Sequence, residues 1–274
     1  MMKMMIKMMV LVMMLMSFAS QSFAVEPGSK ISQLLDFSGL TMQIEGFPET
    51  IKMGISQGSQ KFEQPSDSDS LLTMVDQSID TKAMLNGVAQ DLVKDLSAAD
   101  IDQLLTWYQT DVARRITKAE EAASTAGAFQ EMLEMAESLL ANTKRVEVAK
   151  QFDRLLNTTE FAMNIHKNTQ LAVISSVSKT MNRSEQLDLT MLKSQMDKHE
   201  DQMKASIQQM LIVSFVYTYR DISDEDLDAY FSFLGKPLTK QFNQIVMSGL
   251  DREMEKAVKT LFDNIAFKFS DQAK

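Results

Sequence analysis

The chain has no cysteine among its 274 residues, and glycine, proline and histidine are scarce. Without cysteine there can be no disulfide framework and no lipid anchor on a cysteine, so we expect packing alone to stabilise the fold. With nine glycines and four prolines the chain has few helix breakers, which favours helices. Its hydrophobic content of 45% is that of an ordinary globular protein with a sizeable core.

A surplus of positive charge is also missing, because the formal net charge is −9. Such a surface repels the phosphates of nucleic acids and anionic lipids, so neither is an expected partner. No dense run of lysine and arginine offsets this balance; Arg114 and Arg115 are only a pair.

The first 24 residues have the pattern of a secretory signal peptide. Lys3 and Lys7 give a positive start, residues 8–18 are apolar, and Ser22 and Ala24 are small residues at the −3 and −1 positions of a cleavage site. The alternative is a membrane anchor, but the apolar stretch is shorter than the ~20 residues that span a bilayer. We expect cleavage near Ala24 and a periplasmic or secreted protein without a membrane span.

Apolar residues recur at spacings of three and four in three long segments, 70–96, 184–219 and 237–265. This period predicts amphipathic or buried helices. Residues 58–70, which include Pro65, are predicted to form a loop. The fold class predicted is all-α, with the helices packed as an irregular bundle.

Helix ends are marked as well. Ser97 and Ser223 each stand three residues before an aspartate, the spacing of a capping box. Gly235 and Pro237 predict the end of one helix and the start of the next, because proline is tolerated in a first turn.

An internal repeat divides the chain. Residues 93–97 recur in type at 219–223, an offset of 126, and upstream the Leu34–Leu35 pair recurs at 155–156. Since apolar type and cap position match together, we interpret the chain as a tandem duplication. The predicted modules are residues 25–145 and 146–274, related by pseudo-twofold symmetry.

Two segments carry a signature, at residues 102–116 and 228–242. Its residues are Trp107, Tyr108, Thr110 and Arg114 in the first copy and Phe233, Pro237 and Lys240 in the second. Both segments resemble a bacterial exported all-helical family, the domain of unknown function number two thousand and fifty-nine. The first copy departs from the family pattern with Asp111 and Ala113. The resemblance implies an all-α fold and an envelope location, and it implies no activity.

Ser56 lies in a Gly–Ile–Ser–Gln–Gly segment that matches the nucleophile elbow of hydrolases. That elbow requires a strand before the serine, and none is predicted here. The segment is therefore either a loop or helix end, which we favour, or the nucleophile site of a hydrolase.

Met196, His199 and Met203 share one helical face and could bind Cu(I) through thioether and imidazole groups. The same face continues through Ile207 and Met210, so a methionine-rich core is the interpretation we favour. No other metal site and no cofactor motif is predicted.

Residues 210–219 are the most apolar segment after residue 24, and we expect burial at the centre of the fold rather than a docking groove. The leading functional hypothesis is a non-enzymatic envelope protein that binds a protein, a peptide or an apolar ligand. The alternatives are the copper protein and the hydrolase described above. The sequence predicts no oligomeric state.

Overall fold

The computed structural model describes residue 26 and residues 28–49, 51–52, 65–180 and 200–272. Every regular element in these ranges is a helix, which confirms the all-α prediction. The elements are α2 (Lys30–Phe37), α3 (Leu40–Glu45), α5 (Pro65–Ser78), α6 (Thr81–Asp95), α7 (Ala98–Tyr108), α8 (Asp111–Ala123), α9 (Ala126–Ala141), α10 (Thr143–Leu156), α11 (Thr158–Thr180), α13 (Glu200–Thr218), α14 (Asp224–Leu234) and α15 (Pro237–Gln272).

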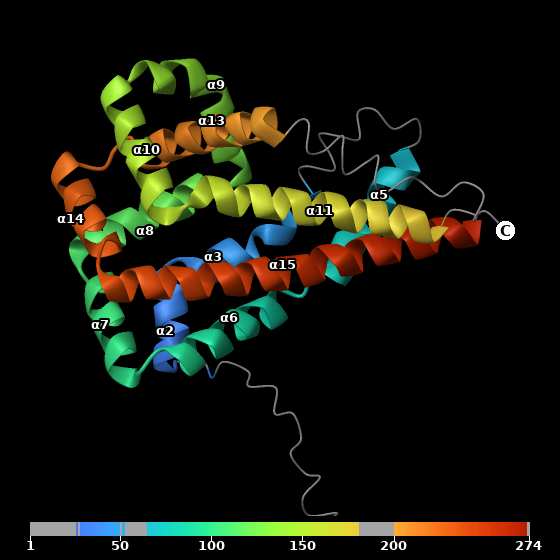
Figure 1. Cartoon of the computed structure of the whole chain (residues 1–274), viewed down its shortest axis with the longest axis horizontal. Coiled ribbons are helices and arrows are strands. Elements are labelled where there is room, and N and C mark those ends of the chain that lie inside the picture. The colour runs from blue at the N-terminus through green and yellow to red at the C-terminus, as the bar shows by residue number, and fades with distance from the viewer. Residues whose placement is uncertain (1–25, 27, 50, 53–64, 181–199, 273–274) are drawn as a thin grey trace, which may run out of the picture.

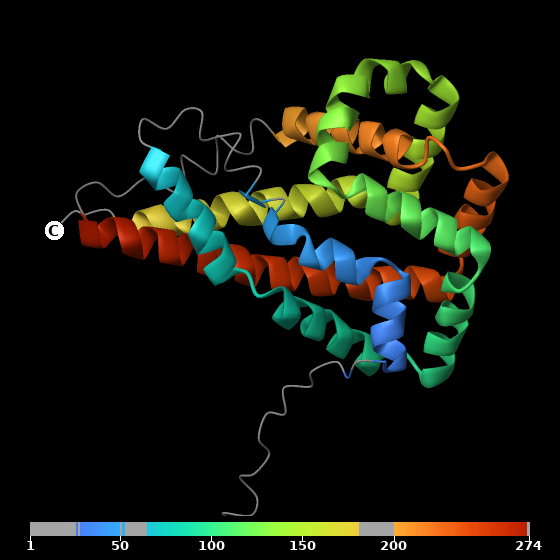
Figure 2. The ribbon, with the colours of Figure 1, turned by 180° about the vertical axis from the view of Figure 1, so that it is seen from behind.

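Helix α15, with 36 residues, runs along the whole molecule and packs against α11, α6 and α5 (Figure 1). Helices α2 and α3 pack against α6 and lie on the face seen in Figure 2. Helices α9, α10 and α13 pack against one another at the end of the molecule where α8 and α14 also lie.

One main core draws side chains from both predicted modules. Its most deeply buried apolar members are Leu34, Val75, Val88, Leu92 and Leu104 from the first half and Phe152 and Phe242 from the second. Burial of each large side chain contributes about 1.5–3 kcal/mol, so this shared core is a main source of stability. The division into modules at residue 145 remains a prediction.

The two signature corners are built alike. Helices α7 and α14 have eleven residues each, and the hydroxyls of Ser97 and Ser223 accept from the N–H groups of Asp100 and Asp226. Both predicted N-caps are confirmed, and α15 begins at Pro237 as expected. The bounds of α7 and α14 differ by the predicted offset of 126, as a duplication would produce. The duplication itself stays a prediction.

Three expectations for local structure need correction. The predicted loop at 58–70 is wrong from Pro65 onward, because proline fits the first turn of α5. The segment 70–96 is divided between two helices, because α5 ends at Ser78 and Asp80 is the N-cap of α6. Residues 210–219 are only partly at the centre: Met210 is 44% exposed, and Tyr219 is buried in the main core. The buried residues between them pack against α9 and α10 in a second, smaller cluster.

Asp153 joins three helices through one buried carboxylate. Its Oδ1 accepts from the hydroxyl of Thr158 (2.7 Å) and the backbone N–H of Thr159 (2.8 Å). Its Oδ2 accepts from the hydroxyl of Thr159 (2.8 Å) and the amide of Gln208 on α13 (3.1 Å). Burial raises the pKa of Asp153, but these hydrogen bonds together lower it below the ordinary value.

We expect Asp153→Ala to lower the free energy of unfolding at pH 7 by about 3 kcal/mol, because it removes a cap and leaves buried donors unpaired. The lowered pKa means that this contribution is present above the ordinary carboxyl pKa of 3.8 and is lost as the pH falls through the lower, folded-state value. Urea unfolding at pH 7 and at acid pH measures both effects. Asp221→Ala, at an exposed position, is the control. Equal stability of the two variants at pH 7 would contradict this account.

Candidate functional site

A cavity of about 370 Å³ lies where α7, α8, α13, α14 and α15 meet beside α3. We call it the inner cavity. Its lining is mainly apolar and aromatic, and includes Tyr108, Phe215, Tyr219, Tyr230, Leu234, Phe242, Val246 and Leu250. Hydroxyl and amide groups add polar points, among them those of Ser38, Ser124, Ser214, Thr218 and Asn243.

Glu120 is the one carboxylate that lines the inner cavity. It stands on α8 at the spacing that follows Ala113, Ile116 and Thr117, so it continues the buried face of that helix. Its Oε1 accepts from the hydroxyl of Tyr219 at 2.6 Å and from the hydroxyl of Tyr230 at 3.0 Å. Helices α8 and α14 and the turn after α13 therefore meet at one oxygen atom.

Burial controls the charge of this group. It raises the pKa of Glu120 above its ordinary value, and the hydrogen bonds from Tyr219 and Tyr230 offset this only in part. Burial and then the nearby carboxylate raise the pKa of Tyr108, Tyr219 and Tyr230. The tyrosines therefore stay protonated at neutral pH and can donate.

Neighbouring aromatic rings hold these tyrosines in place. Phe152 stacks on Tyr219 with ring centroids 5.1 Å apart and lies 5.6 Å from the ring of Tyr230. Phe152 is fully buried and also contacts Phe231 at 4.2 Å. Aromatic pairs of this kind add about 0.5–1.5 kcal/mol beyond burial, so the tyrosine side of the cavity is rigid.

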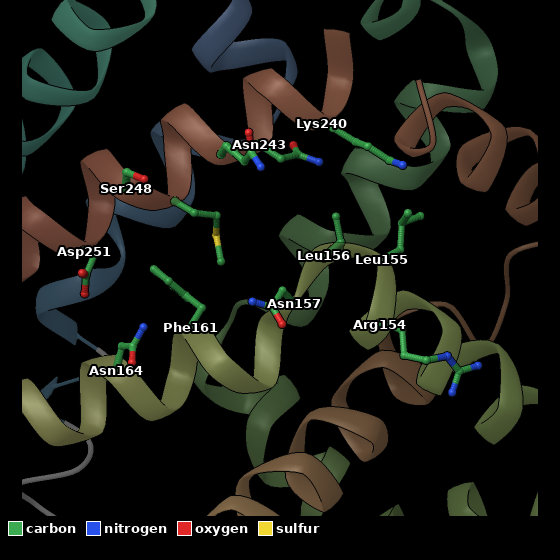
Figure 3. A pocket seen from close by; sticks show the side chains of 12 residues that line it. Arg154, Leu155, Leu156, Asn157, Phe161, Asn164, Lys240, Asn243, Ser248 and Asp251 are labelled. Carbon is green, nitrogen blue, oxygen red and sulfur yellow. The ribbon is translucent and has the colours of Figure 1, made fainter. Parts of the chain in front are cut away.

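A second pocket, of about 520 Å³, opens between α15 and the junction of α10 and α11. We call it the outer pocket. Figure 3 shows Phe161 and Asn164 on α11 facing Asn243 and Ser248 on α15. Its lining also carries charges of both signs, those of Arg154, Lys240 and Asp251. The two spaces adjoin, because Leu156, Asn243 and Met247 line both.

Most of the signature residues have structural roles. Trp107 stacks on Phe233 with ring centroids 4.4 Å apart and an interplanar angle of 12°. Tyr108 meets Phe233 edge-on at 5.6 Å. Thr110 caps α8 by accepting from the N–H of Ala113.

The remaining signature residues differ in their surroundings. Arg114 is exposed and 3.6 Å from Asp111. Pro237 opens α15, and Lys240 lines the outer pocket. Of the whole signature, Tyr108 lines the inner cavity and Lys240 lines the outer pocket.

The other candidates cannot be assembled into a site. Ser56, Met196 and His199 lie outside the described residues, as does the expected signal peptide. Met203 is half-buried on α13. In the ranges that the structure covers, no three or more His, Cys, Asp or Glu side chains are grouped to hold a metal ion.

The sequence did not predict Glu120 as a site residue. With Glu121 it reads as a solvated charge pair, and its tyrosine partners are 99 and 110 residues away. The only local signal is its place on the apolar face of α8.

The described part of the chain is all-helical and carries two adjoining pockets that are partly open to solvent. Residues 82–142, which span α6 to α9, match the model of a family described as "Uncharacterized protein conserved in bacteria (DUF2059)". This match confirms the resemblance at the first signature. The second copy is outside the matched range and remains a prediction. No curated protein and no solved structure matches the chain. Over the described part of the chain, no helix is both long and apolar enough to cross a membrane.

A raised pKa makes Glu120 a source of pH-dependent stability. The folded state binds its proton more tightly than the unfolded state, so stability is fully present below the ordinary carboxyl pKa and falls as the pH rises through the raised one. Glu120→Gln keeps an acceptor for both tyrosines but cannot titrate. As the pH rises from 4 to 8, we expect the melting temperature of Glu120→Gln to increase relative to that of the wild type. Thermal unfolding at stepped pH tests this, with the exposed Glu137→Gln as control. A constant difference between wild type and Glu120→Gln would refute the assignment.

Proposed function

We propose that this protein is a non-enzymatic binding protein of the bacterial envelope that holds an apolar small molecule in the inner cavity. The single observation that carries the proposal is the inner cavity itself. At about 370 Å³ it falls within the range of roughly 300–1,000 Å³ typical of small-molecule sites. Its mainly apolar lining with a few polar groups is also the usual composition of such sites.

A small molecule fits the surface better than a protein or peptide partner. Large exposed apolar side chains such as Val93, Met210 and Phe267 lie on three different helices, α6, α13 and α15. Single exposed apolar residues of this kind are normal, whereas a docking surface presents a contiguous apolar patch. Three of the four tyrosines of the chain line the inner cavity.

The signal-like pattern of residues 1–24 supports the envelope location, and the family that matches residues 82–142 is bacterial. We expect the protein recovered from its bacterial host to lie in the periplasmic fraction with the mass of residues 25–274. An intact full-length chain in the cytoplasmic fraction would contradict the location.

A side chain that fills the inner cavity should weaken the binding of an apolar ligand. The neutral apolar dye N-phenyl-1-naphthylamine should bind the wild type with increased fluorescence. Ser214→Phe places a ring in the cavity from α13 and should weaken binding at least tenfold, because the ring and the dye compete for one volume.

The control is Ser206→Phe, which adds the same ring at an exposed position of α13. Thermal unfolding of each variant checks that the fold is kept, and Thr218→Leu fills the same cavity with a smaller side chain if Ser214→Phe does not fold. Wild-type dye affinity in a folded filling variant would overturn the proposal.

A further inference from the structure

We propose that the inner cavity selects an organic cation, an alkylammonium ligand whose apolar body packs on the aromatic lining and whose charged nitrogen lies beside Glu120. This inference rests on the proposed function and names its class of ligand. It follows from three features of the cavity: an uncompensated carboxylate, a free face on that carboxylate, and aromatic rings around it.

The carboxylate has no counter-charge within the cavity. None of the residues that line the inner cavity is a lysine, arginine or histidine. Glu120 is partly buried, and a carboxylate that loses part of its hydration is stabilised when a cation pairs with it. Two phenol hydroxyls stabilise its negative charge but do not neutralise it.

One oxygen of the carboxylate is left for a ligand. Tyr219 and Tyr230 both donate to Oε1 of Glu120. Among the described residues, no hydrogen bond reaches Oε2. A ligand nitrogen beside Oε2 would supply the missing charge without displacing either tyrosine.

Aromatic rings line the same cavity as Glu120. The rings of Tyr219 and Tyr230 meet at an interplanar angle of 62° with centroids 6.3 Å apart, and Tyr108 and Phe215 complete the lining. The faces of such rings attract cations, by about 0.5–2 kcal/mol each as the site is desolvated. A carboxylate in a cavity that aromatic rings also line favours an ammonium group over a neutral or anionic one.

Arg154 and Lys240 in the outer pocket would favour an anionic ligand, but more weakly than Glu120 favours a cationic one. Arg154 and Lys240 are exposed to solvent, and Asp251 lies in the same lining. Water and salt screen exposed charges, whereas Glu120 acts in a partly dehydrated space. The formal net charge of −9 also draws cations toward the molecule as a whole.

Three probes with the same eight-carbon chain test the inference: octyltrimethylammonium, 1-octanol and octanoate. Calorimetric titration of the full protein at pH 8 measures each affinity. Fluorescence of Trp107, the one tryptophan of the chain, gives a second readout next to Tyr108. We expect the cation to bind at least tenfold more tightly than octanol, and octanoate to bind most weakly.

Glu120→Gln should remove this preference, so that octyltrimethylammonium and octanol bind with similar affinity. Glu121→Gln is the matched control, because it makes the same change of charge one residue away, outside the lining of the cavity. It should keep the preference of the wild type.

If Glu120→Gln does not fold, the pH dependence of ligand binding to the wild-type protein tests the inference instead. The groups that face Glu120 are Tyr108, Tyr219 and Tyr230 from the neighbouring helices, with Glu121 on its own helix. The tyrosines stay protonated throughout, so lowering the pH from 8 to 4 should weaken binding of the cation but not of octanol.

The possible outcomes distinguish a preference for cations from the binding of apolar ligands in general. Equal binding of cation and octanol, unaffected by Glu120→Gln, overturns the inference and leaves apolar-ligand binding standing. Tightest binding of octanoate overturns it and points to Arg154 and Lys240. Failure of all three probes to bind rejects both proposals.

Discussion

The contact of Trp107 with Phe233 is the interaction on which the rest of the structure depends. Stacked at 4.4 Å, these rings join the end of α7 to the end of α14 across 126 residues of sequence. Beside them Arg115 on α8 makes a bidentate ion pair with Asp226 on α14, at 2.8 and 2.9 Å. With α8 held along α14, Glu120 comes to lie against Tyr230 and Tyr219. The cavity is thus a product of the way in which the two halves meet.

A partly buried carboxylate destabilises the folded state, and the structure reduces this cost without removing it. Two tyrosines donate to Glu120, and a fully buried phenylalanine fixes their rings. An apolar residue at this position of α8 would pack in the same place without any desolvation cost. A carboxylate inside a cavity whose lining contains no basic side chain therefore points to a cationic ligand.

Local features of the fold could be predicted from the sequence, and long-range ones could not. The starts of α7, α14 and α15 were predicted because the capping serines and Pro237 act through residues within one turn. The loop at 58–70 was wrong from Pro65 because proline serves both loops and first turns. Glu120 could not be predicted as a site residue, because its partners lie about a hundred residues away and only the packed helices bring them together.

Methionine methyl resonances give the most direct test of the central claim, that the cavity between the halves is the binding site. Met247 lines both the inner cavity and the outer pocket, whereas Met210 is 44% exposed on α13 and lines neither. Addition of N-phenyl-1-naphthylamine to protein labelled with ¹³C at the methionine methyls should shift the Met247 signal through the ring current of the dye. The Met210 signal should not move. A dye that binds and shifts Met210, or other methionines remote from the cavity, while Met247 stays unchanged would contradict the account.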